Sequence, residues 1–273
     1  MKENTVQRIE TKVVTIHVVT VPEEAELTNV LVLETKNKLV MIDVPLLEPY
    51  ARELAEYVAS LGKPVDRLLV THAHPDHWFT RSVFEGVRCQ AFKETIDEIA
   101  VLMPLQIGYH QQLHGALMAK QITPPVETIT PGPLEIDGLQ LQLHNFADTE
   151  DSALMVTELP AIKMMLAQDL VCVGCHLYLG TKDAKGRLTI DNWIAAVQKL
   201  ERQGFERVVP GHGPITDPLP YRGVIEYLEF AKQAIARCST ADEFKAEMNR
   251  RFPEHRVSLV LEMTAFMLYQ WGK

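Results

Sequence analysis

Four side chains able to bind a metal lie close together in the run VTHAHPDHW, which directly follows an apolar segment. They are His72, His74, Asp76 and His77. Imidazole nitrogens and carboxylate oxygens are suitable ligands for zinc, iron and manganese. Such groups gathered in one short loop would repel one another and be poorly solvated without a cation. The run therefore predicts a metal site.

The spacing within the run predicts two adjacent ions. On an extended segment His72 and His74 point to the same side, because side chains alternate along a strand. A turn at Pro75 then leaves Asp76 and His77 free to face a second point in space. A polar loop whose histidines only bond to the backbone is the alternative, and it explains four ligand groups in one loop less well.

Three further segments carry a candidate ligand after an apolar stretch. LVMID ends in Asp43, MMLAQD ends in Asp169, and VVPGHG contains His212. Each alone is a weak signal, because an aspartate after a strand is more often a turn residue and PGHG is a common tight turn. Together with the first run, and in this order, they resemble the HxHxDH pattern of the metallo-β-lactamase-fold superfamily over roughly residues 12 to 217.

The resemblance implies a role for each piece. Asp43 would be a structural aspartate near the site, and Asp169 would be a carboxylate that bridges two metal ions. His212 would be the last histidine of the second ion, beside Asp76 and His77. The second metal site is therefore complete in the sequence.

One piece departs from the family pattern. In the family, a GHT-like turn supplies the third histidine of the first ion, besides the two that correspond to His72 and His74. In this sequence Phe146 stands at that position and cannot bind a metal. Asp148 and His144 are the two possible substitutes. Asp148 is favoured, because a loop can redirect a side chain, whereas His144 lies about 6 to 7 Å back along the strand. A first site that is weak or empty is the third option.

The reaction that this resemblance implies is hydrolysis by a metal-activated water. Two divalent ions are expected, zinc before iron or manganese, and Asp76 is the expected catalytic residue that orients the water. The predicted substrate is a small molecule with an ester, thioester, lactone or amide-type bond. Two other classes stay open: an iron-dependent oxidoreductase on the same fold, and a non-catalytic ligand-binding protein with a defective first site.

Substrate contacts are expected from three residues near the metal ligands. His176 and Tyr178 lie in the stretch HLYL, and similar stretches follow the bridging aspartate in family members. Trp78 directly follows the metal-binding run and could line an apolar pocket. The alternatives are a loop anchor for the first two residues and a core position for Trp78.

Composition favours a soluble, cytoplasmic enzyme. The 273 residues are 47% hydrophobic and 23% charged, which is enough for one large core. A net charge of -9 without a basic block argues against a nucleic-acid partner. The N-terminal residues lack the apolar core of a secretory signal, and no apolar stretch is long enough to cross a bilayer. The CxxC pair of Cys172 and Cys175 has no second pair to complete a zinc site and is interpreted as reduced thiols.

The hydrophobic pattern fits the α/β fold that the resemblance implies, a four-layer αβ/βα sandwich of the metallo-β-lactamase type. Helices are expected at 48–62 and 193–202. Strands are expected at 12–19, 29–34, 38–43, 65–70, 138–146, 153–159, 161–167 and 207–209.

Two helical regions lie outside this pattern. A helical insertion is expected at about 93–120, where His110 and His114 share a helix face and are interpreted as polar lid residues rather than a metal site. Residues 1–217 would form the catalytic domain, and residues 218–273 a helical extension packed on it. The apolar residues of the extension leave a homodimer as an alternative.

Overall fold

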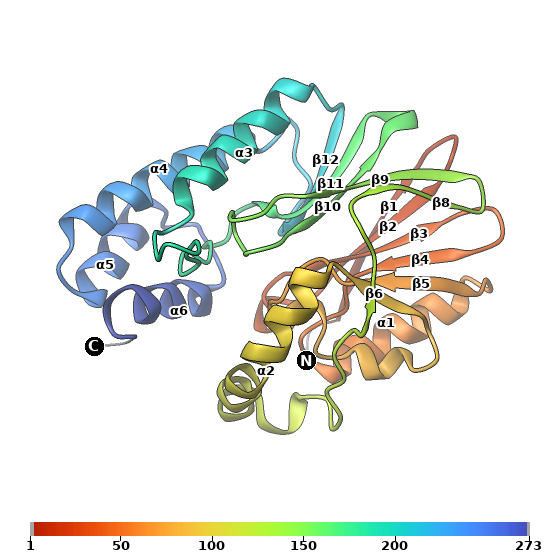
Figure 1. Cartoon of the computed structure of the whole chain (residues 1–273), viewed down its shortest axis with the longest axis horizontal. Coiled ribbons are helices and arrows are strands. Elements are labelled where there is room, and N and C mark those ends of the chain that lie inside the picture. The colour runs from red at the N-terminus through yellow and green to blue at the C-terminus, as the bar shows by residue number, and fades with distance from the viewer. Residues whose placement is uncertain (1–2, 272–273) are drawn as a thin grey trace.

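The computed structural model describes residues 3–271, which form two β-sheets packed face to face with helices on both outer sides (Figure 1). Over these residues the first sheet has seven strands in the order β1-β2-β3-β4-β5-β6-β7. Its first four strands are antiparallel, and the pairs from β4 to β7 are parallel. The strands are β1 (Thr5–Glu10), β2 (Thr15–Thr20), β3 (Asn29–Glu34), β4 (Leu39–Ile42), β5 (Val65–Leu69), β6 (Cys89–Ala91) and β7 (Glu127–Thr128).

The second sheet has five strands in the described chain, in the order β12-β11-β10-β9-β8. Only β11 and β12 are parallel among these neighbours. The strands are β8 (Gly132–Ile136), β9 (Leu139–Asn145), β10 (Met155–Leu159), β11 (Met164–Cys172) and β12 (Arg207–His212). The sequence prediction missed β1, β6, β7 and β8.

The side-chain alternation of β4 shows how the sequence builds the layers. Leu39 and Met41 point outward and share an apolar core with helix α1 (Glu48–Ser60). Val40 and Ile42 point inward, into the core between the two sheets. Because both faces of this strand are buried, all four of its residues are apolar.

Two helices cover the outer face of the second sheet, α3 (Ile190–Gln203) and α4 (Tyr221–Arg237). Trp193 of α3 and Leu228 of α4 lie in one hydrophobic core with Met165 of β11. The predicted four-layer αβ/βα sandwich is therefore confirmed.

The predicted helical insertion is α2 (Lys93–His114), a single helix that continues through Pro104. The predicted helical extension is also present. It consists of α4, α5 (Ala241–Arg251) and α6 (Ser258–Tyr269), and α4 belongs to the core of the second sheet. No helix within residues 3–271 has the length and apolar character needed to span a membrane.

Candidate metal centre

The metal-binding run predicted from the sequence follows β5 and ends in a short 3-10 turn, Pro75–His77. Proline suits the first position of such a turn, because its fixed φ matches the turn and its missing N–H would have no partner there. His72 and His77 are fully buried, and Asp76 is 4% exposed. The run meets side chains from β11, from the end of β12 and from the loop between β9 and β10.

One cluster holds the residues predicted for the second ion. Ligand atoms of Asp76, His77 and His212 all lie within 4.8 Å of one another. Oδ2 of Asp76 lies 3.1 Å from Nε2 of His77 and 3.4 Å from Nε2 of His212. The hydroxyl of Thr28 donates to the same Oδ2 over 2.8 Å, which fixes the orientation of the carboxylate.

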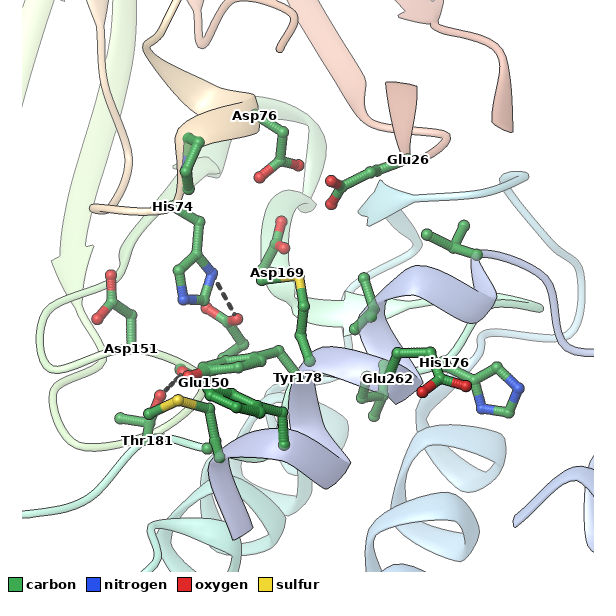
Figure 2. Close-up of a pocket in the computed structure, with 18 of the residues that line it drawn as sticks. Glu26, His74, Asp76, Glu150, Asp151, Asp169, His176, Tyr178, Thr181 and Glu262 are labelled. Atoms are coloured by element: carbon green, nitrogen blue, oxygen red, sulfur yellow. Dashed lines mark hydrogen bonds and ion pairs between the residues drawn. The ribbon is translucent and has the colours of Figure 1, made fainter. Parts of the chain in front are cut away.

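A second cluster contains His72, His74, Asp169 and a residue that the sequence analysis did not name, Glu150. Oε1 of Glu150 lies 2.8 Å from Nδ1 of His74, and its Oε2 lies 3.5 Å from Nε2 of His72. The Glu150 side chain is 3% exposed. Figure 2 shows it pointing at the His74 ring.

Asp169 lies between the two clusters, as predicted for a bridging carboxylate. Its Oδ2 lies 2.8 Å from Nε2 of His212 and 3.9 Å from Nε2 of His72, and its Oδ1 lies 3.4 Å from Nε2 of His77. One carboxylate thus contacts histidines of both clusters. This is the geometry needed to hold two ions side by side.

The prediction of Asp148 as the substitute ligand is wrong for this arrangement, because the carboxylate at the first cluster is Glu150. Asp148 has a left-handed backbone, with φ of 51°, and its N–H donates to the carbonyl of Ser152 over 3.1 Å. This tight turn directs the side chain two residues later into the site.

The other two residues considered at this position do not contact the cluster. Nε2 of His144 lies 2.8 Å from Oε2 of Glu158, a contact between neighbouring strands β9 and β10. Phe146 is 8% exposed and packs into the core of the second sheet. A buried carboxylate therefore lies at the cluster for which the sequence lacks a third histidine.

Partners on the far side of three of the four imidazole rings hold these rings in a ligand orientation. Nδ1 of His77 donates to Oδ2 of Asp43 over 2.8 Å, and Nδ1 of His212 donates to the carbonyl of Glu26 over 2.7 Å. Nδ1 of His72 lies 3.0 Å from the hydroxyl of Thr71. In each case Nε2 is directed at the cluster. Histidines that bind metals commonly have such an outer partner.

Glycine is required where β12 passes Asp169. A Cβ placed on Gly211 would lie 2.1 Å from Oδ1 of Asp169 and 2.5 Å from the carbonyl carbon of Gln168. Only a residue without a side chain lets the two strands approach so closely, which explains one glycine of the PGHG segment.

Buried acidic groups crowd this site. Burial raises the pKa of Glu150 to about 7, against the opposing effect of His74. Burial, with Asp76, raises the pKa of Glu26 to about 8. Burial would lower the pKa of His74, but Glu150 outweighs it and brings that pKa to about 10. A cation would stabilise carboxylates in such a poorly solvated site.

The side chains fit divalent metal ions. Three buried atoms of the two clusters have no hydrogen-bond partner in the described chain: Oε2 of Glu150, Oδ1 of Asp169 and Nε2 of His77. An unpaired buried polar atom costs roughly 1 to 3 kcal/mol, and a cation bound among these three atoms would remove this cost. Imidazole and carboxylate are suitable donors for zinc, iron or manganese.

The clusters lie at the inner end of a cavity of about 560 Å³. Tyr178 lines this cavity beside the metal ligands, with ring centroids of Tyr178 and His74 5.0 Å apart. His176 borders the cavity, but its Nδ1 lies 3.0 Å from the Tyr227 hydroxyl, and in Figure 2 its ring points away from Asp76, Glu150 and Asp169. Of the predicted substrate contacts, Tyr178 is therefore best placed.

The prediction that Trp78 lines the pocket is wrong. Its side chain is fully buried in the core under α1, where Nε1 donates to the carbonyl of Ala73 over 3.1 Å. The CxxC pair lies near the metal ligands. Both thiols are free and border the cavity, and a ligand atom of Cys172 lies within 4.8 Å of ligand atoms of Asp169 and His212.

Comparison with known proteins places the chain among similar sequences and folds. The sequence profile described as "Metallo-beta-lactamase superfamily" matches residues 24–212. No curated protein matches the chain.

Many solved structures share the fold. A metallo-beta-lactamase from Pontibacter korlensis has a TM-score of 0.62 and 22% identity, covering 83% of this chain and 99% of its own. The metallo-beta-lactamase IND-7 has a TM-score of 0.65 and 17% identity, covering 84% and 99%. The metallo-beta-lactamase FIM-1 from Pseudomonas aeruginosa, solved in a mono-zinc form, has a TM-score of 0.62 and 16% identity, covering 84% and 96%.

Proposed function

Because the chain belongs to the metallo-β-lactamase superfamily, we propose that it is a metal-dependent hydrolase that cleaves an ester, thioester, lactone or amide-type bond in a small molecule. The observation that supports this most strongly is the pair of ligand clusters joined by Asp169 at the inner end of the cavity. Zinc is the first candidate for the two ions, with iron or manganese as alternatives.

Divalent ions at such a centre supply a nucleophilic water at neutral pH and polarise the bond under attack. The protein's own residues keep the geometry. Asp43 holds the His77 ring, and Thr28 holds the Asp76 carboxylate. Asp76 lines the cavity (Figure 2), where its carboxylate can accept the hydrogen bond that orients the water. Tyr178 borders the path by which a substrate reaches this point.

The direct experiment measures hydrolysis and metal content together. Purified protein is assayed on nitrophenyl esters, thioesters, lactones and anilides before and after metal removal with a chelator, and again after addition of zinc, manganese or iron(II). We expect hydrolysis that is lost with the metal and returns with it, and that falls at least a hundredfold in Asp76→Asn. Hydrolysis that survives complete metal removal, or none by protein that holds two ions, would contradict the proposal.

One observation favours a second candidate, an iron-dependent oxidoreductase. Glu150 gives the first cluster two histidines with two carboxylates, a donor set that iron(II) accepts well. Iron as the metal of the purified protein, together with oxygen consumption on a reduced substrate and no hydrolysis, would favour this class. The non-catalytic alternative assumed a defective first site, and the position of Glu150 argues against that assumption.

A further inference from the structure

Two helices far apart in the sequence, α2 and α6, contribute side chains to the lining of the cavity. Figure 1 shows the place of each helix in the fold. Each helix has one apolar face that packs on the protein. Ile99 of α2 lies in the core under the first sheet, and Leu261 and Ala265 of α6 lie in the core of the second. This packing uses only part of the apolar surface of each helix.

Each helix also carries a second apolar stripe, and this stripe lines the cavity. Both stripes have the spacing i, i+3, i+7, which places their residues on one helix face. They are Leu102, Leu105 and Tyr109 on α2, and Val260, Met263 and Met267 on α6.

Large apolar side chains at the cavity mouth stay in contact with solvent. Leu105 is 52% exposed and Phe266 is 44% exposed. The charges on the α6 wall are already paired, because Nζ of Lys245 lies 2.8 Å from Oε2 of Glu262. The two stripes themselves therefore offer an apolar surface without charge, whereas the ligand clusters border another part of the same cavity.

We propose that this part of the cavity binds an uncharged apolar group of the substrate, an alkyl or aryl chain held between the two stripes. The orientation of the substrate in this proposal rests on the proposed hydrolase function, which puts the bond to be cleaved at the ligand clusters. Methionines suit such a wall, because their flexible side chains adapt to chains of different shape. A polyanionic group would be disfavoured, since Glu98 and Asp151 line the inner part of the same cavity.

The first test compares nitrophenyl esters from acetate to octanoate with the metal-loaded protein. Burial of each added methylene should raise kcat/KM by about fourfold until the stripes are covered. In Met263→Glu, kcat/KM should no longer rise with the length of the acyl chain. Val101→Glu is the matched control, because Val101 also lies on a wall helix but is 77% exposed and outside the cavity lining.

The second test does not depend on activity. Nile red, an uncharged apolar dye, should bind the metal-loaded protein at a site that Met263→Glu or Leu102→Gln weakens at least tenfold and that Val101→Glu leaves unchanged. The Leu102 variant keeps the test valid if Met263→Glu fails to fold, which circular dichroism will show.

The two proposals can fail separately. If octanoate is cleaved no faster than acetate and dye binding is the same in all variants, the apolar subsite is overturned and the hydrolase stands. If dye binding follows the prediction but no ester, thioester, lactone or anilide is cleaved, the apolar subsite stands and the hydrolase is overturned.

Discussion

Oε1 of Glu150 lies 2.8 Å from Nδ1 of His74, and the Glu150 side chain is 3% exposed. This contact joins the loop between β9 and β10 to the metal-binding run after β5. A carboxylate therefore stands at the first cluster, where the sequence lacks the histidine typical of the family. If it binds the first ion, the site carries one more negative charge than a site of three histidines and one aspartate.

Replacement of Glu150 by glutamine should remove one metal ion. The amide has nearly the same shape but no negative charge, so it is a poor ligand beside His72 and His74. We expect the metal content to fall from two ions per chain to one, and kcat/KM for the best ester to fall at least a hundredfold. Elemental analysis by mass spectrometry measures the first and steady-state kinetics the second.

Asp148→Asn is the matched control for this prediction. Asp148 lies two residues from Glu150 but outside the ligand clusters of the described chain. Two ions and normal activity are expected in this variant. If Asp148→Asn loses a metal ion and Glu150→Gln keeps both, then Asp148 is the ligand, as the sequence predicted, and Glu150 is not.

Asp43→Asn should weaken the second ion without removing any ligand. Oδ2 of Asp43 accepts hydrogen bonds from His77 over 2.8 Å and from Gln168 over 2.6 Å, and its Oδ1 accepts from the Thr71 N–H over 2.8 Å. An amide offers one acceptor where two are used. Loss of such an outer partner typically lowers metal affinity by about 10- to 100-fold.

Competition with a chromogenic chelator measures this loss. Asp137→Asn serves as the control, because that aspartate accepts hydrogen bonds from Thr35 and Asn37 in a surface turn instead of orienting a metal ligand. Equal metal affinity in the two variants would show that Asp43 does not act through His77.

The sequence predicted the parts of this site that depend on local pattern. His72 and Asp76 follow strand β5, whereas Asp169 lies in β11 and His212 is the last residue of β12, and a buried strand fixes the direction of its side chains. The order of these segments matched the superfamily pattern, and this resemblance implied that they form one site.

Glu150 could not be placed in the same way, because its direction depends on the left-handed backbone of Asp148 and on a turn that closes at Ser152. The run DTEDS contains several carboxylates, and periodicity does not distinguish among them in an irregular loop. The prediction for Trp78 was wrong for a different reason. An aromatic residue beside a metal-binding loop can face either the cavity or the core, and only the packing of the folded chain decides which side it faces.

Gly211→Ala should disturb the site by steric overlap. The added methyl group would lie 2.1 Å from Oδ1 of Asp169. It would also lie 2.5 Å from the backbone carbonyl carbon of Gln168, so a shift of the Asp169 side chain alone would not relieve the overlap. We expect destabilisation of about 1 to 3 kcal/mol and lower metal content. Gly223→Ala is the control, because that glycine is in helix α4 with nothing within 4 Å of the added Cβ. Denaturant unfolding compares the two, and equal stabilities would contradict the requirement for glycine at Gly211.

The pH dependence of stability should include a contribution from His110 on α2. This side chain is 2% exposed, and burial, with the neighbouring His114, lowers its pKa from 6.5 to about 4. The folded protein thus keeps His110 neutral at pH 5, where the unfolded chain binds a proton. Stability is therefore lost as the pH falls from about 6.5 toward 4, by about 2 kcal/mol between pH 7.5 and pH 5.

His110→Phe should remove this part of the acid sensitivity, because phenylalanine keeps an aromatic ring but cannot take up a proton. The free energy of unfolding is measured for both metal-loaded proteins at pH 7.5 and pH 5. Since the two proteins have the same metal ligands, metal release at low pH affects both alike and cancels in the difference. The native protein should lose about 2 kcal/mol more than the variant over this range. Equal losses would mean that His110 has the same proton affinity in the folded and unfolded chain, and that its burial on α2 does not keep it neutral.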